Sequence, residues 1–180
     1  MKIPLPENIS LKKIIDEITL KQGVAAIGKR ITEEYANKEP VFISVSNGAM
    51  IFTADLIRSV ALPLRLDSVK ASSYTGTEST GKLNFDLSLK YDIRDQDIII
   101  IDDILDSGLT LQTLSERLLA MHPASLKTCV LLDKPEARKN LISADYVCFT
   151  IPDKFIVGYG LDYNELFRNL PYIAELQINK

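Results

Sequence analysis

The stretch IIIIDDILDSGLT, residues 98–110, decides how the chain folds. Residues 97–101, with four consecutive isoleucines, predict a strand that is buried on both faces. From Leu109 to Met121 the apolar residues recur at helical spacing, which predicts a helix directly after the polar turn. A fully buried strand followed by a helix is typical of a parallel sheet that helices cover on both sides.

The polar residues after this strand predict a ligand site. In open α/β sheets ligands bind beyond the carboxyl ends of the strands, where we expect Asp102 and Asp103. Two adjacent carboxylates repel each other unless a cation or hydroxyl donors bind them, as Mg²⁺ and sugar hydroxyls both do. The turn from Asp106 to Thr110 offers backbone N–H groups, hydroxyls and a helix N-terminus, and Gly108 permits close backbone approach or a positive φ. Together these residues predict a sugar phosphate as ligand.

Two competing hypotheses account for this stretch less well. A helix cap beside solvated acids would account for any one of these side chains, but not for five polar residues behind a buried strand. A calcium-binding EF-hand loop is excluded because the spacing D-x-[DN]-x-[DN]-G is absent.

The rest of the chain alternates strands and helices. Residues 64–90 predict an antiparallel hairpin. In its second strand Leu83, Phe85, Leu87 and Leu89 alternate with polar residues, and the segment 75–82, rich in helix- and strand-breaking residues, is expected to form the mobile tip of the hairpin. At the N-terminus we expect a helix from Leu11 to Tyr35, capped by residues 8–10, which Gly23 could divide into two helices. The remaining expected elements are a strand at 41–46, a turn at Asn47-Gly48, a helix at 49–60, strands at 126–132 and 145–151, and a short helix at 135–141. This order predicts an α/β fold in one domain.

The composition excludes several classes of protein. With 180 residues and 46% hydrophobic residues the chain suits one domain with a core, and its net charge of −3 argues against bulk attraction to nucleic acid. Cys129 and Cys148 lie in apolar strands and predict buried reduced thiols, while the single histidine, His122, leaves no zinc site. The N-terminus lacks a signal peptide and no segment is long enough to span a membrane, so we expect a soluble cytoplasmic protein.

The opening stretch resembles the phosphoribosyl diphosphate signature of type I phosphoribosyltransferases. Three further segments are similar to hypoxanthine-guanine phosphoribosyltransferases: LLDKP at 131–135, the purine-binding segment IPDKFIVGYGLDYNELFRNLPYI at 151–173, and the catalytic loop SSYTGTESTG at 72–81. The four motifs occur in the family's order between residues 41 and 173. The resemblance implies a single domain over 1–180, a parallel sheet flanked by helices, a flexible antiparallel hairpin, and a small hood formed by the terminal segments, to which about 151–180 contribute.

The resemblance also implies a reaction. Hypoxanthine or guanine would attack C1 of 5-phosphoribosyl diphosphate in the presence of Mg²⁺, forming IMP or GMP and diphosphate in purine salvage. A metal suits this chemistry because the leaving diphosphate needs its charge neutralised, and carboxylates stabilise a cation-like ribose. Segment 75–82 would close over the site and exclude water, which competes as a nucleophile.

Roles transfer from the family by position. Asp106 is the expected general base at purine N7, worth roughly 10²–10⁴-fold in rate. Lys134 would donate to O6 and select 6-oxopurines over adenine. Phosphoribosyl diphosphate would be bound by Asp102, Asp103, Asp106, Ser107, Gly108, Thr110, Asn47, Gly48, Ser73, Tyr74 and Arg168, the purine by Lys134, Phe155, Ile156 and Asp162, and Mg²⁺ by Asp102, Asp103 and Asp162.

Asn47 departs from the family, which usually has lysine or arginine before the glycine of the diphosphate loop. Backbone donors do not depend on the side chain, so we expect Asn47→Ala to leave affinity for phosphoribosyl diphosphate within a few-fold. The family's basic residue is also linked to subunit contacts, so a homo-oligomer is expected without a choice between dimer and tetramer.

Two alternatives stay open. A phosphoribosyl diphosphate sensor that binds nucleic acid would need a basic face and often loses the catalytic aspartate, whereas this acidic chain keeps Asp106. A transferase with another base, such as xanthine or a pyrimidine, is the second alternative, because the preference at purine C2 depends on backbone geometry.

Overall fold

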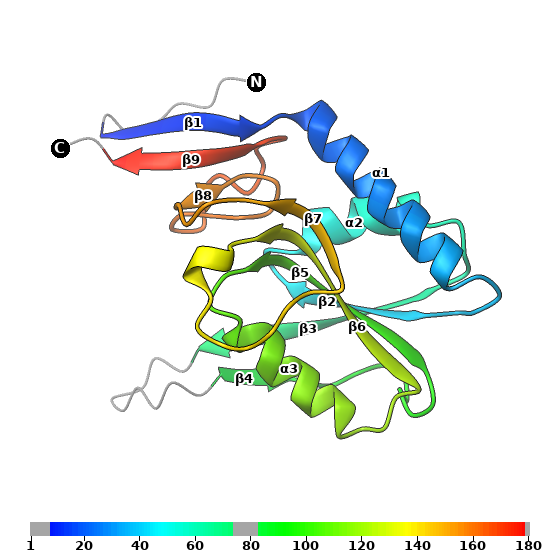
Figure 1. The fold of residues 1–180 in the computed structure, drawn as a ribbon. Helices are drawn as coiled ribbons and strands as arrows, with labels where there is room; N and C mark the ends of the chain where they lie inside the picture. The colour runs from blue at the N-terminus through cyan, green and yellow to red at the C-terminus, as the bar shows by residue number, and fades with distance from the viewer. Residues whose placement is uncertain (1–7, 74–82, 179–180) are drawn as a thin grey trace.

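The computed structural model describes residues 8–73 and 83–178, and its centre is a six-stranded sheet (Figure 1). The strands of this sheet are β2 Val41–Ser46, β3 Arg65–Ser73, β4 Leu83–Asp86, β5 Asp97–Leu105, β6 Ser125–Asp133 and β7 Tyr146–Thr150. They lie in the order β4-β3-β2-β5-β6-β7, all parallel except β4, which pairs antiparallel with β3. The predicted α/β class is confirmed, and so is antiparallel pairing of β3 with β4, but the second strand ends at Asp86 and does not include Leu87 and Leu89. The predicted tip at 75–82 lies outside the described residues.

Helices cover both faces of this sheet, so both faces of the central strand β5 are shielded from water. Helices α1 Glu17–Glu34 and α2 Met50–Ser59 lie on one face, and α3 Leu109–Leu119 lies on the other (Figure 1). Ile99 and Ile101 pack in the cluster formed with α1 and α2, whereas Ile98 and Ile100 pack in the cluster formed with α3. This two-sided burial explains why β5 is apolar without alternation.

The N-terminal segment differs from the expectation, because residues 9–15 form a strand rather than the cap and first turns of a helix. Strand β1 Ile9–Ile15 pairs antiparallel with β9 Ile173–Ile178 from the far end of the chain. Helix α1 begins only after Asp16, whose Oδ1 accepts a hydrogen bond of 2.8 Å from the backbone N–H of Thr19. A partner strand more than 150 residues away decides this pairing, and local periodicity carries no trace of it.

Gly23 does not divide α1 into two helices. It lies inside one continuous helix, where an added Cβ would come within 2.4 Å of Phe149 Cζ on β7. The glycine therefore serves close packing of the helix against the sheet edge. It is no helix breaker here.

The terminal segments form the expected hood. Strand β8 Ile156–Val157 joins β1 and β9 in a three-stranded antiparallel sheet in the order β1-β9-β8. Figure 1 shows this sheet above the carboxyl ends of the parallel strands. Residues from 151 onward thus reach the same end of the molecule as the acidic pair.

The helix expected at 135–141 is reduced to one 3₁₀ turn, Pro135–Ala137, because the following residues turn back toward the loop after β5. Cys129 is buried and Cys148 is half-buried, and both are free thiols as predicted, with burial raising the pKa of Cys148 to about 12. Among the helices described, none is both long and apolar enough to cross a bilayer.

Candidate active site

The site arises where two neighbouring parallel strands stop pairing. The β2–β5 register ends at Ser44 and Ile101, whereas β5 continues beside β6 as far as Leu105 and Asp133. Asp102 and Asp103 therefore lie inside β5, not after its end as the sequence suggested. At these two residues β5 no longer pairs with β2, so a gap opens between β5 and the loop after β2.

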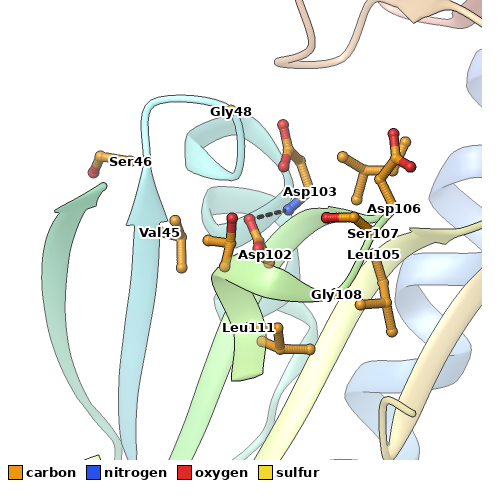
Figure 2. Close-up of a pocket in the computed structure, with 12 residues that line it drawn as sticks. Val45, Ser46, Gly48, Asp102, Asp103, Leu105, Asp106, Ser107, Gly108 and Leu111 are labelled. Atoms are coloured by element: carbon orange, nitrogen blue, oxygen red, sulfur yellow. Dashed lines mark hydrogen bonds between the residues drawn. The ribbon is translucent and has the colours of Figure 1, made fainter. Parts of the chain in front are cut away.

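A cavity of about 230 Å³ fills this gap. Figure 2 shows Asp102 and Asp103 between the loop that carries Ser46 and Gly48 and the turn that carries Ser107 and Gly108. The lining residues are Val45, Ser46, Gly48, Asp102, Asp103, Ile104, Leu105, Asp106, Ser107, Gly108, Thr110 and Leu111. The structure thus brings the predicted acidic pair, phosphate turn and diphosphate loop around one cavity.

The acidic pair is poised to bind positive charge or hydroxyl donors. Asp102 is buried, and its Oδ1 accepts a hydrogen bond of 3.0 Å from the backbone N–H of Asp103. Burial, and then the neighbouring Asp103, hold the pKa of Asp102 well above its usual range. Burial also raises the pKa of Asp103. A ligand that donates hydrogen bonds or carries positive charge would remove the cost of ionising both groups.

Asp103 lies directly against the diphosphate loop. An added Cβ on Gly48 would come within 1.8 Å of Asp103 Oδ2, so any residue other than glycine would displace this carboxylate. Asn47 is exposed and follows a cis peptide bond from Ser46. Its backbone carbonyl accepts from Met50 N at 3.2 Å. Asn47 does not line the cavity, whereas Ser46 does, which the sequence analysis missed.

The phosphate turn has the backbone that the sequence predicted. Gly108 has φ of 86° and caps the N-terminus of α3, a conformation that glycine adopts without strain. Ser107 Oγ accepts a hydrogen bond of 3.4 Å from Leu109 N, and Thr110 lies in the first turn of the helix. The first N–H groups of a helix have no partner within the helix, so this end is suited to an anion.

Asp106 and Lys134 lie together beside this turn. Lys134 follows β6, its side chain is buried, and its Nζ lies 3.7 Å from Asp106 Oδ2. Its backbone N–H donates to Leu105 O at 3.0 Å. Lys134 Nζ also lies 3.5 Å from Asp153 Oδ1. Asp153 was missed, although it belongs to the segment IPDKF that carries the family resemblance.

The hood contributes the remaining predicted residues. Phe155 is half-exposed and packs edge-on against Tyr163, with ring centroids 5.6 Å apart, and Ile156 is buried in β8. Arg168 donates to Gly160 O at 2.8 Å and pairs with Asp162 at 2.7 Å. An exposed aromatic ring beside a second ring suits stacking on a flat base.

Lys134, Phe155 and Ile156 lie outside the cavity lining. Four further predicted residues are paired with each other in the hood or lie at the edge of the described chain. Arg168 and Asp162 bind each other in the hood, and neither lines the cavity. The backbone of Ser73 ends β3, and Tyr74 lies outside the described residues. The roles of these four, like those of the other site residues, stay predictions.

The donor set fits a magnesium ion. Asp102 and Asp103 offer carboxylates to one cavity, and Mg²⁺ is commonly held by one or two carboxylates together with substrate phosphates. Within residues 8–73 and 83–178 no group of three or more His, Cys, Asp or Glu side chains could hold a metal. A metal here would therefore depend on substrate oxygens to complete its coordination.

Comparisons with known proteins match most of the chain to one family. The family described as the phosphoribosyl transferase domain matches residues 11–164. The hypoxanthine-guanine phosphoribosyltransferase of Streptococcus pneumoniae is 40% identical over 171 residues, 93% of this chain and 94% of that protein. The enzyme of the same description from Bacillus subtilis is 44% identical over 167 residues, 92% and 93% of the two chains. The solved structure of hypoxanthine phosphoribosyltransferase from Trypanosoma cruzi, in complex with the product IMP, is similar with a TM-score of 0.86 and 36% identity, over 96% of this chain and 97% of that chain.

Proposed function

The chain belongs to the phosphoribosyl transferase family, among its hypoxanthine-guanine phosphoribosyltransferases, and from that premise we propose the reaction in detail. The protein transfers the 5-phosphoribosyl group from phosphoribosyl diphosphate to hypoxanthine or guanine, with Mg²⁺, and releases IMP or GMP and diphosphate. The single observation that carries the proposal is the placement of Asp106 and Lys134, 3.7 Å apart, next to the acidic pair Asp102 and Asp103 in the cavity.

Asp106 and Lys134 match one edge of a 6-oxopurine. Such a base carries O6 and N7 on neighbouring positions of this edge, and Lys134 can donate to O6 while Asp106 accepts the proton from N7. Adenine has an amino group at position 6, which is a donor and offers the ammonium of Lys134 no acceptor on the base. Phe155 and the backbone of Ile156 then hold the face and edge of the base from the hood.

The cavity residues bind the sugar. The 5′-phosphate is placed on the N–H groups and hydroxyls of Ser107, Gly108 and Thr110, and the ribose hydroxyls are placed on Asp102 and Asp103. The diphosphate lies toward the backbone of the loop at Gly48, and Arg168 is proposed to reach it. A bound Mg²⁺ supplies charge neutralisation to the diphosphate as it leaves.

These positions account for the bonds that change. The bond from N9 of the purine to C1 of the ribose forms, and the bond from C1 to the diphosphate oxygen breaks. The N7 proton of the base passes to Asp106. With the ribose hydroxyls bound to Asp102 and Asp103, these two carboxylates supply the negative charge that a cation-like ribose needs.

The test is turnover with purified protein. Mixing hypoxanthine, phosphoribosyl diphosphate and Mg²⁺ is expected to change the ultraviolet absorbance of the base as it becomes a nucleotide. Omitting Mg²⁺, or replacing hypoxanthine by adenine, is expected to abolish the change. Absence of any change with hypoxanthine and guanine would refute the proposal and favour a sensor.

The base preference and the oligomeric state need separate measurements. The ratio of kcat/KM for hypoxanthine, guanine and xanthine decides the base preference, because the contacts at purine C2 come from the backbone. Sedimentation velocity decides between a monomer and the homo-oligomer that we propose from the family.

A further inference from the structure

Arg138 holds the outer side of the phosphate turn. It lies in the segment after the 3₁₀ turn, and its side chain is only 16% exposed. Nε donates to Asp106 O at 2.9 Å, Nη2 donates to Leu105 O at 3.2 Å, and Nη1 donates to Ile142 O at 2.5 Å. Nη2 also pairs with the carboxylate of Asp133. One planar guanidinium thus binds two successive carbonyls at the end of β5.

Asn140 continues this support by one residue. Its Nδ2 and its backbone N–H donate to Ser107 O at 3.0 and 3.1 Å. The backbone N–H of Lys139 also donates to this carbonyl at 3.1 Å. Three consecutive carbonyls, those of residues 105, 106 and 107, are therefore bound from the side of segment 138–140.

Because the peptide bond is planar, these contacts to the carbonyls also fix the direction of the N–H groups of Ser107 and Gly108. Among the described residues the one cis bond is Ser46–Asn47, so the peptides from Asp106 to Ser107 and from Ser107 to Gly108 are trans. In a trans peptide the carbonyl of one residue and the N–H of the next point in opposite directions. With the carbonyls of Asp106 and Ser107 bound by Arg138 and Asn140, the N–H groups of Ser107 and Gly108 face away from that segment.

Side-chain packing supports the same arrangement. An added Cβ on Gly108 would come within 2.6 Å of Ile142 Cγ2 and 3.2 Å of Arg138 Cδ, so this segment lies close against the turn. Neither Arg138 nor Asn140 is among the residues that line the cavity. Each guanidinium nitrogen of Arg138 already donates to Leu105, Asp106, Ile142 or Asp133, so Arg138 is placed to act on a ligand through the turn.

We propose that Arg138, assisted by Asn140, is a positioning residue that orients the N–H groups of Ser107 and Gly108 toward the 5′-phosphate. The inference rests on the proposed function for the identity of the ligand. It assigns the arginine no contact with substrate. It predicts a loss of phosphate affinity that leaves the purine side of the site unchanged.

The experiment compares Arg138→Gln and Arg138→Lys with wild type, and Arg94→Gln serves as control because Arg94 is an exposed arginine outside the site. Calorimetry with ribose 5-phosphate is expected to show a dissociation constant about tenfold higher for Arg138→Gln. The reason is that misplaced N–H groups of Ser107 and Gly108 would bind the phosphate much more weakly. The KM for phosphoribosyl diphosphate is expected to rise similarly, while the KM for hypoxanthine stays within about twofold. Arg138→Lys is expected to recover little, because one ammonium cannot bind both carbonyls in the plane of a guanidinium.

The outcomes separate this inference from the proposed function. If Arg138→Gln is folded by circular dichroism and binds ribose 5-phosphate like wild type, the inference is wrong. An equal loss of affinity for hypoxanthine would also overturn it, because it would indicate a general loss of structure. If Arg138→Gln does not fold, the same comparison is made with Arg138→Lys and Asn140→Ala. If wild type binds ribose 5-phosphate but turns over no base, the proposed function fails while the affinity ratio still decides the role of Arg138.

Discussion

Replacing Gly48 by alanine tests whether the diphosphate loop and the acidic pair form one unit. Gly48 is not in the left-handed region, so its backbone accepts alanine. The new Cβ would lie 1.8 Å from Asp103 Oδ2 and 2.6 Å from Asp103 Cγ, whereas ordinary contact begins at 3.4 Å. The carboxylate must retreat, and the shortfall for Oδ2 is 1.6 Å, the difference between 3.4 and 1.8 Å.

A retreat of this size predicts a large kinetic effect and a small effect on stability. Misplacing a positioning group by about 1 Å can cost on the order of 10²-fold, so we expect kcat/KM for phosphoribosyl diphosphate to fall by about that factor. The side chain of Asp103 can rotate, at a cost of about 0.5–1.5 kcal/mol if it leaves its preferred rotamer. Steady-state kinetics and urea denaturation measure the two quantities.

A double-mutant cycle shows whether the effect acts through Asp103. In the Asp103→Ala background the clashing carboxylate is absent, so Gly48→Ala is expected to change kcat/KM by no more than about threefold. Near-normal activity of Gly48→Ala alone would refute the steric reasoning. So would a full, multiplicative loss in the double variant, because Gly48 would then act independently of Asp103.

Three further substitutions test other contacts. Lys134→Met removes the donor proposed for O6, a charged hydrogen bond worth about 1.5–3 kcal/mol, so kcat/KM for hypoxanthine in the absorbance assay is expected to fall about 10–100-fold; unchanged activity would exclude this role. Hydrogen bonds from Lys127 and from the hydroxyl of Tyr146 lower the pKa of Glu34 below 4.5. The contribution of ionised Glu34 to folding stability is therefore present above pH 4.5 and is lost as the pH falls through the lowered pKa. The free energy of unfolding of Glu34→Gln, from urea titrations across this pH range, is therefore expected to fall less on acidification than that of wild type, and equal slopes would contradict this. Tyr159→Phe removes the hydroxyl that donates to Asp55 and joins the hood to α2, so unfolding in urea is expected to cost about 1–3 kcal/mol less, and an unchanged midpoint would contradict this contact.

Much of the site could be predicted from the sequence because its residues lie close together along the chain. Asp102, Asp103, Asp106 and the turn to Thr110 occupy nine consecutive positions, and a buried strand followed by a helix N-terminus leaves few ways to arrange them. Their convergence on one cavity is confirmed. Lys134 lies beside Asp106 because β5 and β6 are adjacent and their carboxyl ends meet at one edge of the sheet.

The errors and omissions share one physical cause, which is contact between distant parts of the chain. Residues 9–15 are a strand because β9 pairs with them, and their own pattern of apolar residues does not contain that information. Asp153 was overlooked because its relation to Lys134 exists only after the hood has returned over the sheet. Arg138 was predicted only as part of a short helix, although its guanidinium binds the carbonyls of the turn.

By itself the sequence determined which segments are strands buried on two faces, where the acidic pair and the phosphate turn follow, and which chemistry their side chains can perform. Local periodicity, turn residues and side-chain type suffice for this, since each acts over a few neighbouring positions. Only the tertiary structure decided that pairing between β2 and β5 ends at Ile101, which opens the cavity beside Asp102. It also decided that Arg138 supports the turn from outside, because register and long-range hydrogen bonds depend on elements that the chain brings together only when it folds.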